Sequence, residues 1–335
     1  MRIGAYGEVM LRLTPPEYLM LEQTNTLRMS YTGTGVNLVG NLARFGVETY
    51  LMTALPNNRL GNAAIAHLKS LGIHTAHTIQ QMQHIGTYFA EMGYGIRPTE
   101  VTYQNRLNSS FSLSNIKDFP IDAFLQAVDI IHICGISLSL TDETAHTAIE
   151  LARRAQEEGK EVCFDFNFRP ALNQTDGKKE VMKARYEEIL PYCTILFGSK
   201  RDLVELMEWT GSGEENVEED ILIQSFMKYY EIKWFAGTRR QKNHQEKMLS
   251  GYLWTQTGKA VTMPQSVDIL DRIGTGDAYA AGILLGFTEN WTIEETVAFA
   301  VANARLAHTT HGDTPLTTRK QVYQLLDDPD IDLIR

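Results

Sequence analysis

Apolar runs and amphipathic stretches alternate along most of this chain of 335 residues. Ile130–Cys134, Val162–Phe166 and Thr194–Phe197 are short, continuous and apolar, which is typical of strands buried on both faces of a sheet. Between the first two, Thr141–Gly159 opens with Thr-Asp-Glu-Thr, continues with helical spacing and ends in glycine, which predicts a capped helix. A helix between two such strands predicts an α/β fold with a doubly wound, mostly parallel sheet.

The same pattern continues toward the C-terminus. Lys233–Ala236 is a weaker strand candidate, and the segment from Gly276 to His308 is predicted to be mostly helical. Two regions depart from the pattern, because Arg12–Tyr31 is polar and irregular whereas Gly86–Ser112 alternates as strands do. We expect them to form a small β lid over a cleft. The predicted units are an α/β core of residues 1–11, 32–85 and 113–335 and a lid of residues 12–31 and 86–112.

Composition and charge narrow the classes of function. The formal net charge of -10 disfavours a broad attraction to nucleic acid or to an anionic membrane surface. No apolar run approaches the ~20 residues that span a bilayer, and the N-terminus lacks a secretory signal. Cys134, Cys163 and Cys193 are scattered, which favours buried thiols over a disulfide framework or a zinc site. We therefore expect a cytoplasmic protein with no nucleic-acid partner, no membrane partner and no resident metal site.

A glycine-rich turn ahead of an apolar helix carries the strongest chemical signal. Gly274, Thr275 and Gly276 precede Asp277, and the apolar run Ala278–Phe287 follows. The glycines allow successive backbone N–H groups to point at one anion, and the N-terminus of the helix adds positive potential there. Asp277 is placed to accept a proton from a bound hydroxyl while these amides stabilise a transferring phosphoryl group. The structural alternative is a glycine turn with an aspartate in the first turn of a helix.

The stretch Asp271-Arg-Ile-Gly-Thr-Gly-Asp277 resembles the C-terminal motif of the ribokinase-like (PfkB-type) carbohydrate kinases. The resemblance implies that Asp277 is the catalytic base, that the amides of Gly274–Gly276 form the anion hole, and that ATP with Mg2+ is the phosphoryl donor. Many members have Thr after the first Asp of the motif, where this chain has Arg272. An Asp-Arg opening looks like the 2-keto-3-deoxygluconate kinase branch of the family.

Two further segments are similar to sugar-binding motifs of these kinases. Gly33, Gly35 and Asn37 resemble the N-terminal motif, in which the glycine backbone and an Asn contact the sugar. Asn167 and Arg169 follow a predicted central strand and look like the Asp-x-Asn-x-Arg-Pro segment of ketodeoxygluconate kinases. A guanidinium suits a sugar acid because it pairs with a carboxylate through two hydrogen bonds. The structural alternatives are a helix cap at Asn37 and an internal ion pair for Arg169.

The predicted lid supplies additional candidates for the sugar. Arg106 is a second candidate partner for the acid group, and Tyr88 and Tyr103 are placed to line the sugar. Related enzymes often carry Tyr or Asp just before this Arg, whereas this chain has Gln104 and Asn105. Aromatic residues are also common in strands without any function, which is the alternative for Tyr103.

The nucleotide contacts are assigned from weaker resemblances. Ser199 and Asp202 occupy the place of the family's Asn-x-x-Glu motif, which helps to organise magnesium and phosphates. Thr238 and Arg239 resemble a Thr-Leu-Arg variant, from which Arg239 would meet ATP phosphate; an exposed basic turn is the alternative. Asn303 would lie near the adenine.

These resemblances imply an ATP-dependent kinase that phosphorylates the terminal hydroxyl of 2-keto-3-deoxygluconate to give 2-keto-3-deoxy-6-phosphogluconate. A kinase for a neutral sugar such as fructose or ribose is the alternative among enzymes, and a non-catalytic sugar-binding regulator on the same fold is the alternative outside them. A nicotinamide dehydrogenase is disfavoured because no dinucleotide fingerprint follows the first strand. The lid strands have edges that could pair between subunits, so a homodimer is also expected to be feasible.

Overall fold

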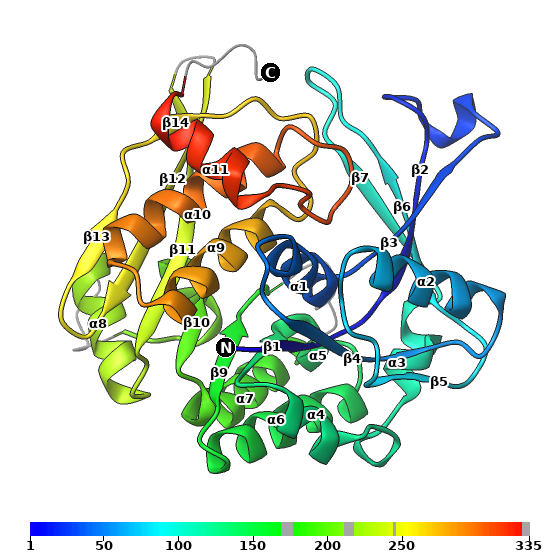
Figure 1. Ribbon diagram of the computed structural model, residues 1–335, viewed down its shortest axis with the longest axis horizontal. Coiled ribbons are helices and arrows are strands. Elements are labelled where there is room, and N and C mark those ends of the chain that lie inside the picture. The colour runs from blue at the N-terminus through cyan, green and yellow to red at the C-terminus, as the bar shows by residue number, and fades with distance from the viewer. Residues whose placement is uncertain (169–176, 211–217, 244–245, 330–335) are drawn as a thin grey trace.

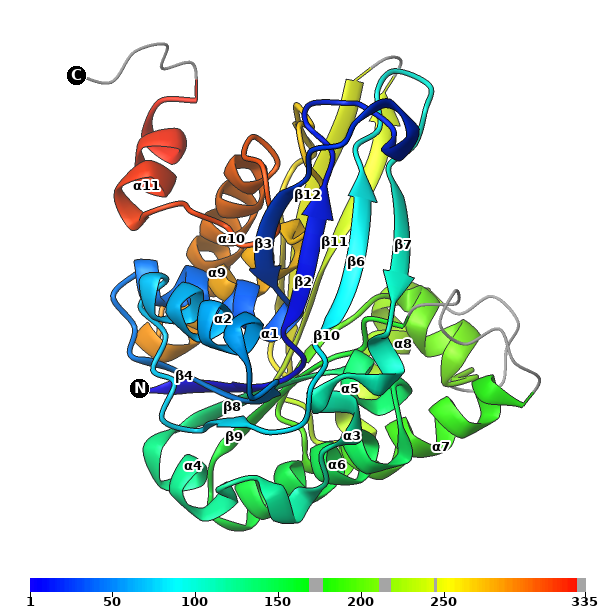
Figure 2. The same cartoon turned by 90° about the vertical axis from the view of Figure 1, so that its right-hand side faces the viewer.

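A large, mostly parallel sheet with helices on both faces forms the body of the molecule (Figures 1 and 2). This computed structural model describes residues 1–168, 177–210, 218–243 and 246–329. The strand order is β13-β12-β11-β10-β9-β8-β1-β4-β5, with β14 paired to β12. The strands from β11 to β5 are parallel to their neighbours, whereas β12 pairs antiparallel with β11, β13 and β14. The strands are β1 (Ile3–Tyr6), β4 (Thr49–Leu55), β5 (Thr78–Gln80), β8 (Ile130–Cys134), β9 (Glu161–Asp165), β10 (Ile195–Phe197), β11 (Trp234–Asn243), β12 (Glu246–Thr255), β13 (Lys259–Val261) and β14 (Gln265–Ser266).

The helices divide between two hydrophobic cores, one on each face of this sheet. In β9, Val162 and Phe164 belong to one core and Cys163 to the other, because successive side chains of a strand point to opposite faces. One core is covered by α1 (Thr34–Arg44), α2 (Arg59–Ser70), α9 (Thr275–Glu289), α10 (Ile293–Ala307) and α11 (Arg319–Asp327). The other is covered by α3 (Ser110–Leu113), α4 (Ile121–Ala127), α5 (Gly135–Ser139), α6 (Asp142–Glu157), α7 (Lys178–Ile189) and α8 (Glu219–Tyr229). The doubly wound α/β fold expected from the sequence is confirmed.

A second, smaller sheet stands beside the main one. Its strand order is β3 (Arg28–Thr32), β2 (Met10–Thr14), β6 (Gly86–Glu91) and β7 (Glu100–Gln104). Figure 1 shows this second sheet at the upper right and the β11–β12 hairpin at the upper left, with α9 and α1 between them. The segment Arg12–Tyr31, expected to be irregular, therefore contributes to two of its strands. Phe111, placed in the lid by the sequence, instead packs in a core of the main sheet.

Local sequence signals explain where several elements begin and end. The Thr141 hydroxyl accepts a hydrogen bond from the Thr144 backbone N–H at 3.2 Å, which caps the start of α6 as the Thr-Asp-Glu-Thr pattern predicts. The helical C-terminal segment is α9 and α10. The strand predicted at Lys233–Ala236 is longer than expected, because β11 continues to Asn243. None of the described helices combines the length and the apolar character needed to cross a bilayer.

Candidate active site

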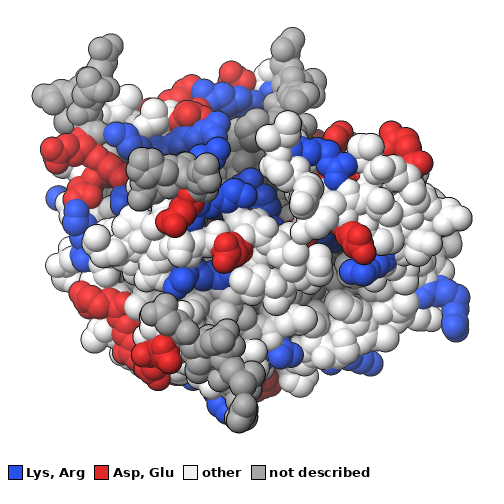
Figure 3. Space-filling model, turned by 90° about the horizontal axis from the view of Figure 1, so that it is seen from above, with Lys and Arg blue, Asp and Glu red and all other residues white. Residues whose placement is uncertain are grey.

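A cavity of about 710 Å³ lies where the main sheet, the second sheet and the start of α9 meet. Residues at the carboxyl ends of β9 and β10 line it, as do residues of β6, β7 and β11. This edge is where open parallel α/β sheets bind ligands. Figure 3, which looks down on the molecule from above Figure 1, shows Lys and Arg side chains gathered around the middle of this face. Three arginines line the cavity among five carboxylates, so individual guanidinium groups, and not a broad positive field, are placed to meet an anionic ligand; the arginines are Arg106, Arg240 and Arg272.

The Gly274–Asp277 segment, named the anion loop below, begins α9 at the cavity wall. Gly274 is the N-cap of the helix with φ +82°, and a Cβ at this position would lie 1.7 Å from the backbone oxygen of Asp313. Only glycine fits both the left-handed backbone and this close approach. A Cβ on Gly276 would meet nothing within 4 Å, so the turn is open on the cavity side. The first N–H groups of α9 have no partner within the helix and are available to an anion.

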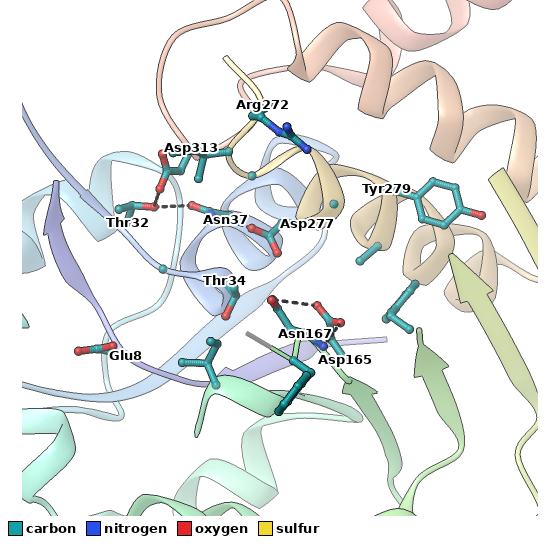
Figure 4. A pocket seen from close by; sticks show the side chains of 18 of the residues that line it. Glu8, Thr32, Thr34, Asn37, Asp165, Asn167, Arg272, Asp277, Tyr279 and Asp313 are labelled. Atoms are coloured by element: carbon teal, nitrogen blue, oxygen red, sulfur yellow. Dashed lines mark hydrogen bonds between the residues drawn. The ribbon is translucent and has the colours of Figure 1, made fainter. Parts of the chain in front are cut away.

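Asp277 lies in the first turn of α9 and is held by Asn37 of α1. Its side chain lines the cavity, and the residue is only 7% exposed. Asn37 Nδ2 donates to Asp277 Oδ2 at 2.7 Å, and Asn37 Oδ1 accepts from the Thr314 hydroxyl at 3.0 Å, with the Thr32 hydroxyl also 3.0 Å away. The acceptor contact orients the amide so that its NH2 group faces the carboxylate. Figure 4 shows the Asp277 carboxylate pointing into the cavity beside Asn37.

The two glycines of the N-terminal motif have different surroundings. Gly33 lines the cavity as the N-cap of α1, and a Cβ there would lie 2.1 Å from the backbone oxygen of Glu8. Gly35 does not line the cavity; a Cβ there would lie 3.2 Å from Ala5 Cβ, so this glycine allows α1 to pack closely on β1. Both glycines were expected to approach the sugar, but only Gly33 lies in the cavity lining. Thr34, which was not predicted as a site residue, also lines the cavity.

Arg106 lies in the cavity wall beneath the second sheet. Its Nε donates to Glu8 Oε2 at 2.9 Å, and its guanidinium carbon lies 4.7 Å from the centre of the Tyr103 ring. Its Nη1 is buried and has no hydrogen-bond partner within the described residues. Burial raises the pKa of Glu8, and the Arg106 charge opposes that shift. An arginine with an unpartnered buried N–H group in a cavity wall is suited to an anionic group of a ligand.

Tyr88 also lines the cavity, but its hydroxyl is used internally. The hydroxyl donates to Asp313 Oδ2, so a ligand in the cavity can pack against the Tyr88 ring but does not receive a hydrogen bond from its hydroxyl. Burial raises the pKa of the Tyr88 hydroxyl, and the Asp313 charge adds to this shift. Tyr103 lies next to it, with the two ring centres 6.0 Å apart, and is 45% exposed.

Asn167 lies just after β9, opposite the anion loop in Figure 4. Its backbone N–H donates to Asp165 Oδ1 at 3.1 Å, and its Nδ2 donates to Asp165 Oδ2 at 3.4 Å. Its φ of 37° is uncommon for a residue other than glycine, although Asn tolerates this region. Its Oδ1 is buried without a hydrogen-bond partner among the described residues. Arg169, the other candidate of this segment, lies outside the described residues.

The far end of the cavity contains candidates for the nucleotide. Ser199, Asp202 and Thr238 all line it. The backbone N–H and the hydroxyl of Ser199 donate to Asp202 Oδ2 at 2.8 and 2.7 Å. Burial raises the pKa of the Asp202 carboxyl, and the Ser199 hydrogen bonds oppose this shift. Among the described residues, no three His, Cys, Asp or Glu side chains gather closely enough to hold a metal ion.

Arg239 and its neighbour Arg240 point to opposite faces of β11. Arg239 does not line the cavity: its Nη2 donates to Glu219 at 2.6 Å, and its guanidinium lies over the Tyr252 ring. Arg240 lines the cavity and donates from Nη2 to Thr275 Oγ1 at 3.1 Å. The phosphate contact predicted from the sequence was Arg239, whereas the residue of this pair in the cavity lining is Arg240. Strand alternation from Thr238, a cavity residue two positions earlier, could have indicated it.

Two other predicted residues are buried away from the cavity lining. Asn303 Nδ2 donates to Asn41 Oδ1 and to the Ala278 backbone oxygen, each at 2.7 Å, and its Oδ1 accepts from Thr317. Its amide therefore joins α10 to α9 and does not reach the cavity, where the adenine contact was expected. The side chain of Thr275 is likewise buried and donates to the Arg272 backbone oxygen at 3.0 Å, so that only its backbone N–H serves the predicted anion hole.

Comparison with known proteins relates this arrangement to a family. The family profile described as pfkB family carbohydrate kinase matches residues 2–236 and 248–319. A 2-dehydro-3-deoxygalactonokinase of Haloferax volcanii is 25% identical over 322 residues, which cover 96% of this chain and 95% of that protein. A 2-dehydro-3-deoxygluconokinase of Bacillus subtilis is 24% identical over 327 residues, covering 96% of this chain and 94% of that protein.

Solved structures agree with this relationship. A crystal structure from Enterococcus faecalis, provisionally named a 2-keto-3-deoxygluconate kinase, shares 55% identity with a TM-score of 0.97 and covers 100% of this chain and 99% of that one. The 2-dehydro-3-deoxygluconokinase of Thermotoga maritima shares 27% identity with a TM-score of 0.90, over 98% of this chain and 99% of that one. The family profile spans most of the chain and includes both the α1 segment and the anion loop. The chain therefore belongs to the pfkB family of carbohydrate kinases.

Proposed function

We propose that this kinase transfers the γ-phosphoryl group of ATP to the terminal hydroxyl of 2-keto-3-deoxygluconate, giving 2-keto-3-deoxy-6-phosphogluconate and ADP. The observation that carries the proposal is the Asp277 carboxylate at the N-terminus of α9, in a cavity that Arg106 also lines. The names of the Enterococcus, Thermotoga and Bacillus relatives support the choice of sugar acid.

The chemistry needs a proton acceptor and a site for negative charge. The oxygen of the sugar hydroxyl forms a bond to the γ-phosphorus of ATP, and Asp277 takes the proton of that hydroxyl. The bond from that phosphorus to the bridging oxygen breaks, and ADP leaves with the electron pair. The backbone N–H groups in the first turn of α9, which have no partner within the helix, would face the charge that spreads over the phosphoryl oxygens. The Asn37 contact keeps the carboxylate oriented toward the hydroxyl.

Selection of an acid over a neutral sugar rests on Arg106. Its Nε is fixed by Glu8, which leaves the unpartnered Nη1 group for a substrate carboxylate. A neutral sugar in the same place would leave this buried donor without a charged acceptor, which disfavours it. Arg169, implied by the resemblance of its segment, is proposed as the second partner of the carboxylate.

The nucleotide is proposed to bind along β10 and β11. Ser199, Thr238 and Arg240 line that part of the cavity, and Arg240 contacts Thr275 at the start of α9. We therefore assign the phosphate-binding cation to Arg240 in place of Arg239. The Asp202 carboxylate is a hard oxygen donor of the kind that Mg2+ takes alongside nucleotide phosphates. Bound Mg2+ would neutralise phosphate charge.

Asp277→Asn tests the proposal, because it removes the proton acceptor and keeps the size and a hydrogen-bond acceptor for Asn37. A coupled ADP-release assay with 2-keto-3-deoxygluconate should show turnover lower by about 10²–10⁴-fold. Calorimetric binding of ATP and of the sugar acid should remain within about threefold of the wild type, since no binding group is lost. Unchanged turnover would remove Asp277 as the base, and a wild type inactive on this sugar acid would refute the substrate.

A further inference from the structure

An arginine of the second sheet is buried between two aspartates of the main domain. Arg12 in β2 donates from Nη2 to Asp271 Oδ2 at 2.8 Å and from Nη1 to Asp313 Oδ1. The three side chains are 3%, 0% and 4% exposed, and the two pairs join positions 259 and 301 residues apart. Arg12 Nε donates to Thr14 at 2.9 Å, which fixes the guanidinium within its own sheet. Arg12 does not line the cavity.

Both aspartates lie next to the anion loop. Asp271 Oδ1 accepts the backbone N–H of Ile273 at 3.1 Å, and its Oδ2 accepts that of Gly312 at 3.2 Å. The backbone oxygen of Asp313 lies against Gly274, at the place where a Cβ would be 1.7 Å away. The guanidinium thus anchors the residues on either side of the turn that begins α9.

The same network continues to the proposed base. Asp313 Oδ2 accepts hydrogen bonds from Tyr88 and, at 2.8 Å, from Thr32. Thr32 Oγ1 also lies 3.0 Å from Asn37 Oδ1, and Asn37 donates to Asp277. Figure 4 shows Asp313, Thr32, Asn37 and Asp277 in this sequence along one side of the cavity. One carboxylate therefore connects a tyrosine of the second sheet with the catalytic segment.

We propose that Arg12 is a positioning residue for phosphoryl transfer, which sets the second sheet at a fixed distance from the anion loop. The inference rests on the proposed function, because the second sheet carries Tyr88 and Tyr103 into the cavity lining while the loop carries the proposed base. Transfer requires the hydroxyl and the phosphoryl group at about 3–3.5 Å, and a misplacement of about 1 Å costs about 100-fold. A buried ion pair contributes little net stability compared with apolar residues, so stability alone does not explain this cluster.

Two variants separate positioning from folding. Arg12→Lys keeps the charge but reaches only one carboxylate at a time. Arg12→Met combined with Asp313→Asn keeps the net charge of the buried cluster, because one cation and two carboxylates are replaced by one carboxylate. Arg28→Met, an exposed arginine on the neighbouring strand β3, is the matched control. Melting temperature, kcat and the KM values for ATP and the sugar acid are measured for all three.

Both Arg12 variants should fold and show kcat lowered by about 10–100-fold, with both KM values within about threefold of the wild type. The Arg28 variant should match the wild type. The positioning role is overturned if a folded Arg12 variant keeps kcat within about twofold, if the loss appears only in KM, or if neither variant folds, since Arg12 would then be purely structural.

Hydrogen exchange in the ligand-free protein gives a readout that does not depend on the substrate. The backbone N–H groups of Ile273 and Gly312 are bonded to Asp271, so both should exchange about tenfold faster in the Arg12 variants and unchanged in the Arg28 control. Unchanged exchange at both amides would overturn the inference. A wild type inactive on 2-keto-3-deoxygluconate with accelerated exchange in the variants would refute the proposed function and leave the anchoring role standing.

Discussion

The contact between Asn37 and Asp277 gives a prediction about pH. Asn37→Leu replaces the amide by an apolar group of similar size and removes the Nδ2 donor, which lies 2.7 Å from Asp277 Oδ2. Both residues are buried, at 3% and 7% exposure, so water does not readily replace the lost donor. The carboxylate is then less well stabilised in its charged form than in the wild type.

The size of the effect follows from the charge on the acceptor. A hydrogen bond to a charged group contributes about 1.5–3 kcal/mol. About 1.4 kcal/mol corresponds to a factor of ten in a rate, so this contribution corresponds to about 10–100-fold. In the wild type, protonation of the carboxyl costs the hydrogen bond from Asn37, whereas in the variant it does not. The acidic limb of the rate profile therefore moves to higher pH. On that limb the variant should be about 10–100-fold slower, and the difference should narrow at alkaline pH.

The assay is coupled ADP release, with kcat followed across the pH range in which the wild type is stable. Thr314→Val is the matched control, because it removes a hydroxyl bonded to Asn37 Oδ1 at 3.0 Å without touching the carboxylate. A smaller shift is expected there. An unshifted acidic limb together with a raised KM for the sugar would show that Asn37 does not stabilise the charged carboxylate, and it would support the direct sugar contact predicted from the sequence.

Three further predictions concern the nucleotide, the sugar acid and stability. Arg240→Met should raise KM for ATP about 10–100-fold, whereas Arg239→Met, on the other face of the strand, should stay within about threefold; equal effects would contradict the assignment. Arg106→Lys keeps a charge beside Glu8 but loses the fork of donors, so the ratio of kcat/KM for 2-keto-3-deoxygluconate to that for fructose should fall at least about tenfold; an unchanged ratio would exclude Arg106 from selection. Burial lowers the pKa of His132 to about 4 from 6.5, so the folded chain binds fewer protons than the unfolded chain between these values, and stability is lost as the pH falls. In urea titrations at several pH values, His132→Leu should lower the slope of the free energy of unfolding against pH by about 1.4 kcal/mol per pH unit between pH 4 and 6.5. An unaltered slope would show that the protonation of His132 does not change on unfolding.

The parts of the site that the sequence could predict are those encoded by neighbouring residues. The anion loop follows from glycine spacing directly before an apolar helix, and the start of α6 follows from the Thr141 cap, because both depend on interactions within a few positions. The main sheet follows from continuous apolar strands such as Ile130–Cys134, which is β8 without change.

The remaining parts depend on contacts that no local pattern contains. Arg12 meets Asp271 and Asp313 only after folding, and its surroundings in the sequence are polar and resemble a loop. Assigning Arg240 to the cavity required the length of β11, which extends beyond its apolar start. Asn37 was recognised as a site residue, but its partner lies 240 positions away, so the contact with the base could not be inferred.

Steady-state kinetics of the wild type can establish whether this pfkB kinase acts on a sugar acid in preference to a neutral sugar. 2-Keto-3-deoxygluconate, fructose and ribose are compared at saturating ATP by coupled ADP release, and the phosphorylated position of each product is identified by NMR. We expect a kcat/KM for 2-keto-3-deoxygluconate at least about 100-fold above that for fructose, with phosphate on the terminal hydroxyl. A kcat/KM for fructose that equals or exceeds that for the sugar acid would contradict this expectation.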